Sequence, residues 1–231
     1  MNDLSQFQVT ARWPAAHPDR LQLYSLPTPN GVKVSIMLEE TALPYEVHKI
    51  DFAQKDQRTP EYLSLNPNGK IPAIIDPNGP GGQPLALYES GVILLYLAEK
   101  TGQLMPEDPV ARWHVQQWLM WQVGNVGPIF GQVGYFHKFD GREVSDKRPL
   151  KHYATEASRL LRTLDDHLLG RTWIVGDDFS IADISLIGMV RNLVEFYKAG
   201  HLVDYDAREN VQAWLERALT RPAVQKGLAT P

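Results

Sequence analysis

The chain has 231 residues, of which 43% are hydrophobic and 22% charged, and this composition is typical of a globular protein with a sizeable core. Its net charge of −4 argues against nucleic-acid binding, and no apolar run is long enough to span a membrane. The first residues lack the apolar centre of a signal peptide, so a cytoplasmic location is expected. The absence of cysteine excludes disulfides, thiolate metal sites and a cysteine nucleophile. Any thiol chemistry must therefore use a thiol from another molecule.

The first forty residues predict an arm, a strand and a helix. Residues 1–20 show no sustained periodicity, which predicts a flexible arm. Residues 21–26 (LQLYSL) alternate between apolar and polar types and predict a strand. Thr28 and Asn30 are residue types that start helices, and GVKVSIMLEETAL continues with apolar residues at helical spacing. A largely buried helix is expected there.

Five further elements complete the first half of the chain. They are strands at 45–52, 70–76 and 84–90, and helices at 59–67 and 90–102. The order is β-α-β-α-β-β-α in about eighty residues, an ordinary size for a small domain. The first two strands are joined by a helix and should be parallel, whereas the last two form a hairpin and should be antiparallel. This mixed order predicts a thioredoxin-like α/β domain at 21–102.

Long helical patterns dominate after residue 102, and no strand signal of comparable strength remains. They lie at 110–124, 149–170, 180–196 and 210–224. We therefore expect a linker at 103–108 and an all-helical bundle domain at 109–231. The sequence between Ser180 and Asp183 has the form of a capping box that starts a core helix. The tryptophans are expected in the core of this domain: Trp113, Trp118, Trp121, Trp173 and Trp214.

Motifs in both halves of the chain carry a resemblance to a known superfamily. They are NPNGKIPAIID with LALYESGVILLYLAEK in the first half and FSIADIS in the second. They resemble the glutathione-binding half and the second-domain capping box of the glutathione transferase superfamily. Three more motifs, TPNGVKV, QRTPE and WQVGNVGPIFGQ, resemble the nu class and the related nitrogen-regulator branch, whose members act as glutathione-dependent disulfide reductases. The resemblance covers about residues 21–226.

The resemblance implies a binding site for the γ-glutamyl end of glutathione at Glu89 and Ser90. The Ser90 hydroxyl and N–H would hold the carboxylate at the start of a helix, where unpaired N–H groups favour anions. Glu89 would accept from the γ-glutamyl ammonium. From residue types alone, a helix cap at Ser90 and a dipole-complementing Glu89 are the more common explanation.

The rest of the peptide is implied to bind around Pro72. In this superfamily that proline is cis, and Ile71 would pair through its backbone with the cysteinyl unit. Lys70 could reach the glycyl carboxylate, although an exposed lysine is ordinarily only solvated. Gln57 is implied to hydrogen-bond the glycyl end, although an isolated glutamine is ordinarily a polar loop residue.

The turn TPNG stands where most members of the superfamily carry Tyr, Ser or Cys. Tyr24 is predicted within the strand before this turn and is rejected as the catalytic residue. The Thr28 hydroxyl and the Asn30 amide are donors, and together with the helix start they would lower the pKa of a bound glutathione thiol. Residue types alone favour a purely structural role for both. The resemblance reverses that preference and makes Thr28 and Asn30 the expected catalytic residues.

A second glutathione is implied for the nu class, where a basic residue early in the next helix helps to hold it. His152 occupies that position in place of the expected arginine, which leaves one or two glutathiones per subunit open. Lys147, Arg148 and Lys151 lie nearby and could substitute. Gly124, Gly127, Pro128 and Gly131 predict a break in the preceding helix. The aromatic residues that follow could line a pocket for the second substrate, or simply pack between domains: Tyr135, Phe136, His137 and Phe139.

The resemblance implies a homodimeric enzyme that reduces small disulfides with glutathione as its cosubstrate. Conjugation of glutathione to an electrophile and reduction of peroxides use the same first site and remain alternatives. A non-catalytic glutathione-binding or interaction module is the alternative from another class. No metal is expected, because four of the histidines lack metal-ligand spacing with carboxylates: His48, His114, His167 and His201.

Overall fold

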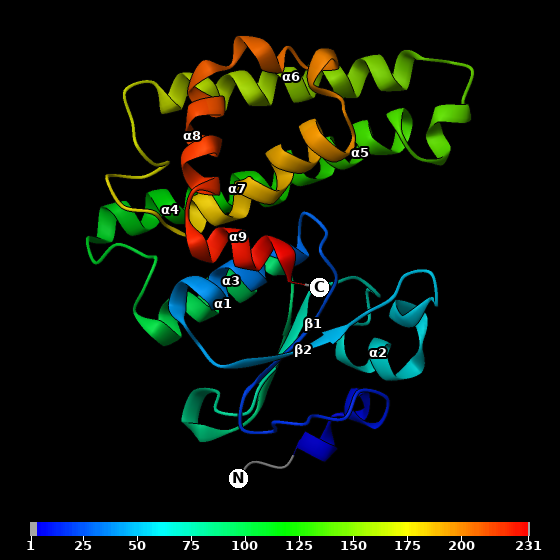
Figure 1. The fold of residues 1–231 in the computed structure, drawn as a ribbon, viewed down its shortest axis with the longest axis vertical. Coiled ribbons are helices and arrows are strands. Elements are labelled where there is room, and N and C mark those ends of the chain that lie inside the picture. Colours follow the sequence, from blue (N-terminus) through cyan, green and yellow to red (C-terminus); the bar gives the residue numbers. More distant parts are fainter. Residues whose placement is uncertain (1–3, 231) are drawn as a thin grey trace. The chain divides into compact units, whose positions relative to one another are not determined.

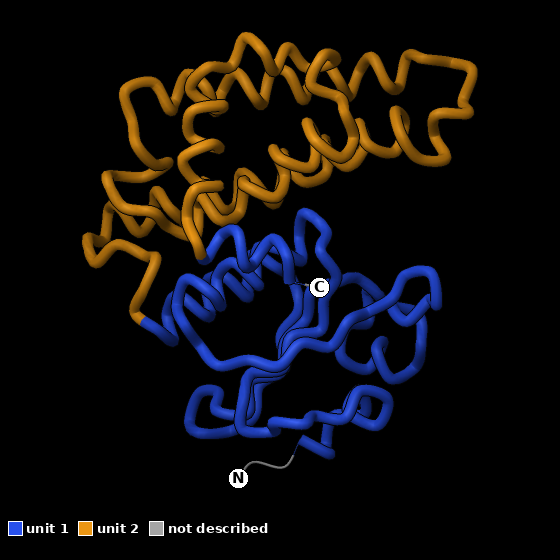
Figure 2. The backbone as a smooth tube through the Cα atoms, viewed as in Figure 1, with its two compact units in different colours: residues 1–101, 223–231 blue, residues 102–222 orange. Residues whose placement is uncertain are grey.

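The computed structural model describes residues 4–230, which form two compact units (Figure 2). Unit 1 runs to Thr101 and also includes the chain from Ala223 onward, and unit 2 is Gly102–Pro222. The chain thus divides close to the expected linker. The predicted extent of the helical domain, 109–231, is wrong at its end, because the last helix packs within unit 1.

A mixed four-stranded sheet forms the centre of unit 1. Its strands are β1 (Leu21–Ser25), β2 (Tyr45–Lys49), β3 (Ala73–Asp76) and β4 (Leu85–Tyr88). Their order in the sheet is β2-β1-β3-β4, with β1 and β2 parallel and β3 antiparallel to both β1 and β4. This is the predicted thioredoxin-like arrangement, and it follows from the helical connection between the first two strands and the hairpin between the last two.

Three helices cover the two faces of this sheet (Figure 1). They are α1 (Gly31–Thr41), α2 (Pro60–Leu65) and α3 (Ser90–Thr101). Helices α1 and α3 lie side by side, and most of α1 is buried, as its apolar spacing predicts. On the other face, Tyr62 and Leu65 of α2 pack with Tyr24 and Ile75 of the sheet.

The segment before β1 packs against the α2 face of the sheet. It contains two short 3-10 turns, Leu4–Gln6 and Gln8–Ala11. Leu4 and Val9 are buried in the same apolar cluster as Tyr62. The prediction of a flexible arm at 1–20 is therefore wrong for residues 4–20. Aperiodic apolar side chains can still fill a sheet face, because neither 3-10 turns nor irregular chain has a period that the sequence reveals.

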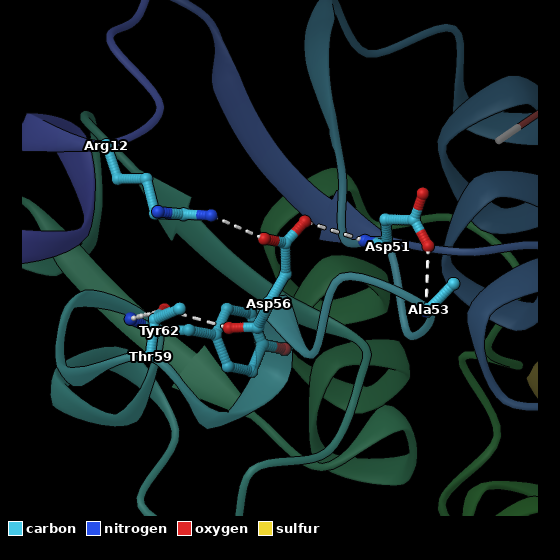
Figure 3. Close-up of polar contacts among 6 residues, drawn as sticks. All are labelled: Arg12, Asp51, Ala53, Asp56, Thr59 and Tyr62. Carbon is cyan, nitrogen blue, oxygen red and sulfur yellow. Dashed lines mark hydrogen bonds and ion pairs between the residues drawn. The ribbon is translucent and has the colours of Figure 1, made fainter.

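An ion pair fastens this segment to the loop before α2 (Figure 3). Arg12 Nη2 lies 2.7 Å from Asp56 Oδ1, and Asp56 Oδ2 accepts from the Asp51 N–H at 2.9 Å. The Asp56 carbonyl oxygen also accepts from the Thr59 hydroxyl at 2.8 Å. The buried Asp56 carboxylate thus has a cation on one oxygen and a backbone donor on the other, which fixes the loop that carries Gln57.

Unit 2 is helical throughout its regular structure. Its α-helices are α4 (Pro109–Trp121), α5 (Gly127–His137), α6 (Arg148–Leu168), α7 (Ile181–Arg191) and α8 (Glu209–Leu219). The capping box is present as predicted: Ser180 Oγ accepts from the Ala182 N–H, and Asp183 Oδ2 accepts from the Ser180 N–H. Helix α7 that follows is the buried core helix of the unit. Among residues 4–230, no helix is long and apolar enough to cross a membrane.

The glycine-rich region after α4 does not break the helix. Gln122–Val126 forms a π-helical turn that joins α4 directly to α5. The prediction of a break is wrong because a wider turn can carry the chain past Pro128, which has no N–H to donate. Glycine and proline signals alone do not distinguish the two outcomes. A second π-helical turn, Asn192–Phe196, follows α7.

The last helix, α9 (Pro222–Ala229), packs against α1 of unit 1. Ser35 Oγ donates to the Gly227 carbonyl oxygen at 2.6 Å, and Lys226 pairs with Glu39 at 2.8 Å. Gly227 approaches α1 so closely that a Cβ there would lie 2.5 Å from the Ile36 Cα. The helix predicted over 210–224 is therefore two helices, and the second supports α1.

Candidate active site

Three segments of unit 1 meet at one end of the sheet. Tyr24 of β1 pairs with Ala73 of β3, and Ala73 also pairs with Tyr88 of β4. Because β3 is antiparallel to both neighbours, the turn that follows β1, the residue before β3 and the residue after β4 lie at the same edge. The register thus brings together the residues predicted from three separate motifs.

The turn between β1 and α1 is tight. A Cβ on Gly31 would lie 2.0 Å from the Leu26 carbonyl oxygen, so only glycine fits. Thr28 caps the helix, since its Oγ1 accepts from the Gly31 N–H at 3.2 Å and its carbonyl oxygen accepts from Val32. The Thr28 hydroxyl hydrogen can still be donated to a ligand. Tyr24 lies buried within β1, as predicted, and burial raises its pKa.

Asn30 stands at the N-cap position of α1, but its side chain makes other contacts. Asn30 Oδ1 accepts from Lys33 Nζ at 2.9 Å and from Ser90 Oγ at 3.4 Å. Because both contacts are made by the amide oxygen, the NH₂ end of this exposed side chain is directed away from them. The turn therefore offers a fixed amide donor at its surface.

Lys33 also lies at this edge, in contact with Asn30 and Ser90, and it is not among the site residues predicted from the sequence. Its side chain is only 1% exposed, and its Nζ also lies 3.4 Å from Ser90 Oγ. Burial lowers the pKa of Lys33 to about 7, and the charge of nearby Glu89 opposes this shift. The sequence signal that could have identified Lys33 is its position as the single cation in a helix whose apolar spacing predicts burial.

The junction between β4 and α3 turns sharply at Glu89. Glu89 has φ +73°, a left-handed conformation that side chains rarely adopt. This turn leaves Glu89 exposed and makes the buried Ser90 the first residue of α3. Since α1 also begins at this edge, two helix N-termini point toward the same place and favour an anion there.

The Ile71–Pro72 peptide bond is cis, as the resemblance implies. Strand pairing of β3 begins at Ala73, so the backbone of Ile71 lies outside the register of the sheet. The Lys70 carbonyl oxygen accepts from Tyr62 Oη and from Asn66 Nδ2, both at 2.7 Å, which holds the segment in place. The Lys70 side chain is exposed.

Gln57 carries a buried oxygen whose bonding capacity is unused. Its Oε1 has no hydrogen-bond partner among residues 4–230. The Gln57 backbone lies beside Gly69, where a Cβ would come within 2.9 Å of the Gln57 carbonyl oxygen. Gln57 therefore borders the segment that leads to Pro72, and its free acceptor suits a donor from a bound molecule.

Both halves of the chain match known families. Residues 28–100 match the family described as Glutathione S-transferase, N-terminal domain, and residues 150–217 match Glutathione S-transferase, C-terminal domain. The disulfide-bond oxidoreductase YfcG of Escherichia coli (strain K12) is 39% identical over 209 residues, which cover 90% of this chain and 94% of that protein. The chain belongs to the glutathione transferase family.

This glutathione transferase is also similar to solved structures that contain glutathione. A glutathione transferase from Pseudomonas putida with one glutathione disulfide per subunit is 60% identical, with a TM-score of 0.98 and 99% of each chain covered. A glutathione transferase from Burkholderia graminis with two glutathione molecules per subunit is 61% identical, with a TM-score of 0.98, and the match covers 100% of this chain and 96% of that one.

In unit 2, His152 belongs to a group of aromatic residues. It lies exposed on α6 with its ring 5.2 Å from that of Tyr153, and Tyr153 stacks on Phe136 at 5.8 Å. Tyr135 contacts Phe136 edge to face at 5.0 Å. The structure therefore gathers His152 with two of the aromatic residues predicted for the second pocket.

Two of the basic residues near His152 have local partners. Lys147 Nζ donates to the carbonyl oxygens of Arg142 and Val144, both at 2.9 Å. Arg148 forms an exposed ion pair with Asp146 at 2.6 Å. Lys151 is exposed on the same helix as His152. Of the three predicted substitutes, Lys151 is the one whose side chain has no hydrogen bond or ion pair within residues 4–230, so no such bond must break before it binds an anion.

Proposed function

We propose that this glutathione transferase reduces small disulfides with a thiolate supplied by glutathione, and that it belongs to the nu class. The observation that carries the proposal is the Asn30 amide, held by its oxygen with its NH₂ exposed where two helices begin. Such donors can stabilise a thiolate, and the chain has no cysteine of its own to stabilise. The name of the Escherichia coli relative, a disulfide-bond oxidoreductase, supports the same reaction.

Glutathione would lie along the edge formed by the three segments. Ser90 and the start of α3 would hold the γ-glutamyl carboxylate, and Glu89 the ammonium. The backbone of Ile71, before cis Pro72, would pair with the cysteinyl unit. The buried Gln57 Oε1 would accept from the peptide N–H of the glycyl unit, and the Lys70 ammonium would reach its carboxylate. The unused acceptor of Gln57 supports this direction of the peptide.

The turn would act on the sulfur alone. Thr28 and Asn30 donate hydrogen bonds but cannot accept the thiol proton at neutral pH, so that proton passes to solvent. The thiolate attacks a disulfide and forms a mixed disulfide, and the departing thiolate takes a proton from water. A second glutathione thiolate then attacks the mixed disulfide, which releases glutathione disulfide and the second reduced thiol.

We further propose that the second glutathione binds with the help of His152 and Lys151. The two molecules per subunit in the Burkholderia graminis relative support a second site. An imidazole is a weaker partner for a carboxylate than an arginine, because it cannot form the two parallel hydrogen bonds that a guanidinium donates. We therefore expect weaker binding of the second glutathione than an arginine would give.

A homodimer forms part of the proposal. Val110, Trp113 and Met120 lie on one face of α4 and are 62%, 70% and 49% exposed. The prediction that Trp113 belongs to the core is therefore wrong, whereas Trp173 and Trp214 are buried. Exposed apolar faces of this kind mark association surfaces. The reaction consumes reduced glutathione, which a reducing cytoplasm supplies, so we propose that compartment.

The test is glutathione-dependent reduction of hydroxyethyl disulfide across a range of pH. Asn30→Ala and Thr28→Ala should each lower turnover by about 10–1000-fold, the range for removing a donor to a developing anion. The kinetic pKa should rise in both. Conjugation of chlorodinitrobenzene should be weak throughout, since the site stabilises a thiolate without selecting an electrophile. Wild-type rates in both variants would rule out a catalytic role for the turn. Glutathione binding by the wild type without any turnover would favour a non-catalytic binding module.

A further inference from the structure

The buried position of Lys33 is unusual for its residue type. Lysine is almost never fully buried without a partner, because a desolvated ammonium is costly. Lys33 lies in the first turn of α1, three residues after Asn30, and is enclosed between α1 and the start of α3. A lysine that served only solubility would lie on the exposed side of the helix. Its burial next to Asn30 therefore suggests a functional role.

The contacts of Lys33 join two parts of the proposed glutathione site. Its Nζ donates to Asn30 Oδ1 at 2.9 Å and to Ser90 Oγ at 3.4 Å. Ser90 Oγ in turn donates to Asn30 Oδ1 at 3.4 Å. Lys33, Ser90 and Asn30 therefore form a triangle that connects the turn after β1 with the start of α3. The short side of this triangle is the bond from the ammonium to the amide.

This bond selects one of the two orientations of the Asn30 amide. An amide presents an acceptor at one end and donors at the other, and an ammonium carries only donors. Rotating the amide by half a turn would place NH₂ against the ammonium and lose the bond. Lys33 therefore keeps the oxygen inward and the NH₂ outward. A neutral side chain without donors at this position would allow both orientations.

We propose that Lys33 is a positioning residue that presents the Asn30 NH₂ group to the sulfur of glutathione. This inference rests on the proposed function of the turn. Lys33 acts through Asn30 and does not itself touch the sulfur.

Substrate binding should draw a proton onto Lys33. In the protein alone, the charge of Glu89 raises the pKa of Lys33, but burial outweighs it and holds that pKa at about 7. A glutathione carboxylate bound at Ser90 would add a second negative charge beside the ammonium. A nearby negative charge raises the pKa of an amine, so binding and protonation should be coupled.

A double-mutant cycle tests whether Lys33 acts through Asn30. Lys33→Met should lower kcat/KM for disulfide reduction by about 10–100-fold and raise the kinetic pKa of the thiol. In an Asn30→Ala background the same change should have little further effect, because the amide that Lys33 orients is gone. Lys49→Met, a change at an exposed lysine at the end of β2, is the matched control and should leave both values unchanged.

The outcomes separate this inference from the proposed function. If Asn30→Ala is impaired but Lys33→Met retains wild-type activity and kinetic pKa, the inference is wrong and the proposed function stands. The inference also fails if Lys33→Met costs the same factor with and without Asn30. Wild-type activity in Asn30→Ala would remove the proposed function of the turn and this inference with it.

A second measurement needs only the wild-type protein, should Lys33→Met not fold. Calorimetry of S-methylglutathione binding in two buffers of different protonation enthalpy gives the number of protons taken up. S-methylation removes the thiol, so its proton does not contribute. At a pH about one unit above the pKa of Lys33, we expect net proton uptake, and none in a folded Lys33→Met variant. No uptake by the wild type would contradict the predicted coupling between glutathione binding and protonation of Lys33.

Discussion

Two buried charges, Lys33 in unit 1 and Asp183 in unit 2, differ in what they contact. Asp183 accepts from the N–H groups of Ile174 and Ser180, both at 3.0 Å, and from Trp214 Nε1 at 2.9 Å. All these partners are buried. Lys33 donates to the buried Ser90 but also to Asn30, which is exposed. A buried charge with buried partners stabilises the fold, whereas one with an exposed partner can orient that partner toward a ligand.

The two charges also respond to burial in opposite directions. Desolvation raises the pKa of Asp183, and its donors oppose the shift. Desolvation lowers the pKa of Lys33 to about 7. Several hydrogen bonds converge on the carboxylate of Asp183 and favour its charged form, so removing it should damage the fold. Removing the charge of Lys33 should damage function more than stability.

The largest effect is expected for Asp183→Ala. The change leaves the Ile174 and Ser180 N–H groups and the Trp214 indole without their acceptor in a buried place. We expect a loss of about 3–5 kcal/mol in the free energy of unfolding, the range for removing one side of a buried charged network. Denaturant titration measures it, with Asp178→Ala, at an exposed position in the same loop, as the control. Equal losses in the two variants would contradict a structural role for Asp183.

A smaller effect is expected where α9 supports the helix that carries Lys33. In Gly227→Ala the new methyl group would lie 2.5 Å from the Ile36 Cα, so the two helices must move apart. Overpacking of this kind costs about 1–3 kcal/mol. Gly200→Ala is the matched control, because a Cβ there meets its nearest atom at an ordinary 3.5 Å.

Thermal unfolding of both glycine variants, together with the affinity for glutathione, decides this point. We expect Gly227→Ala to lose stability and to bind glutathione more weakly, because α1 carries both Asn30 and Lys33. Unchanged stability of Gly227→Ala would show that packing of α9 does not stabilise α1 in solution.

An effect on stability of intermediate size is expected at Asp56, a buried carboxylate whose partner Arg12 is half-exposed. Arg12→Met leaves the buried carboxylate with its backbone donor but without its ion pair. The Arg12 side chain is 44% exposed, so solvent screens the pair and the expected loss is only about 1–2 kcal/mol. The KM for glutathione should also rise, since Asp56 fixes the loop of Gln57. Arg20→Met, at an exposed arginine nearby, should change neither value.

The most gradual effect is the pH dependence that Lys33 gives to stability, because it is spread over the whole window between the two pKa values of this lysine. Its pKa is about 7 in the folded state against 10.5 when unfolded, so the unfolded chain binds more protons between these values. The destabilisation caused by burying the ammonium is therefore absent above 10.5 and grows as pH falls toward 7. The free energy of unfolding of the wild type, relative to Lys33→Met, should rise by at most about 1.4 kcal/mol per pH unit within that window. A flat difference would mean that Lys33 titrates normally.

Elements of the first half of the chain could be predicted because their signals are local. The alternation of β1 and the helical spacing of α1 lie within a dozen residues, and the connections decide which strands run parallel. The resemblance then grouped Asn30, Ser90 and Pro72, and the strand register places all three at one edge.

Features that depend on distant contacts could not be predicted. Val9 lies in the same buried cluster as Tyr62, and Gly227 fits against Ile36, yet no local pattern connects the members of either pair. The burial of Lys33 also depends on a distant contact, with Ser90. From the sequence, a lysine between Val32 and Val34 is expected on the exposed side of the helix. The contact with α3, which buries it, is not visible in the local sequence.

The central claim, that the turn stabilises a borrowed thiolate, is tested most directly by the thiol pKa of bound glutathione. Ultraviolet absorbance of the thiolate, titrated in the complex, gives this value. For the wild type we expect it to fall from about 8.5 toward about 7, and in Asn30→Ala to return most of the way to the free value. A bound thiol that titrates at about 8.5 in the wild type, or at one lowered value in both proteins, would contradict the role assigned to Asn30.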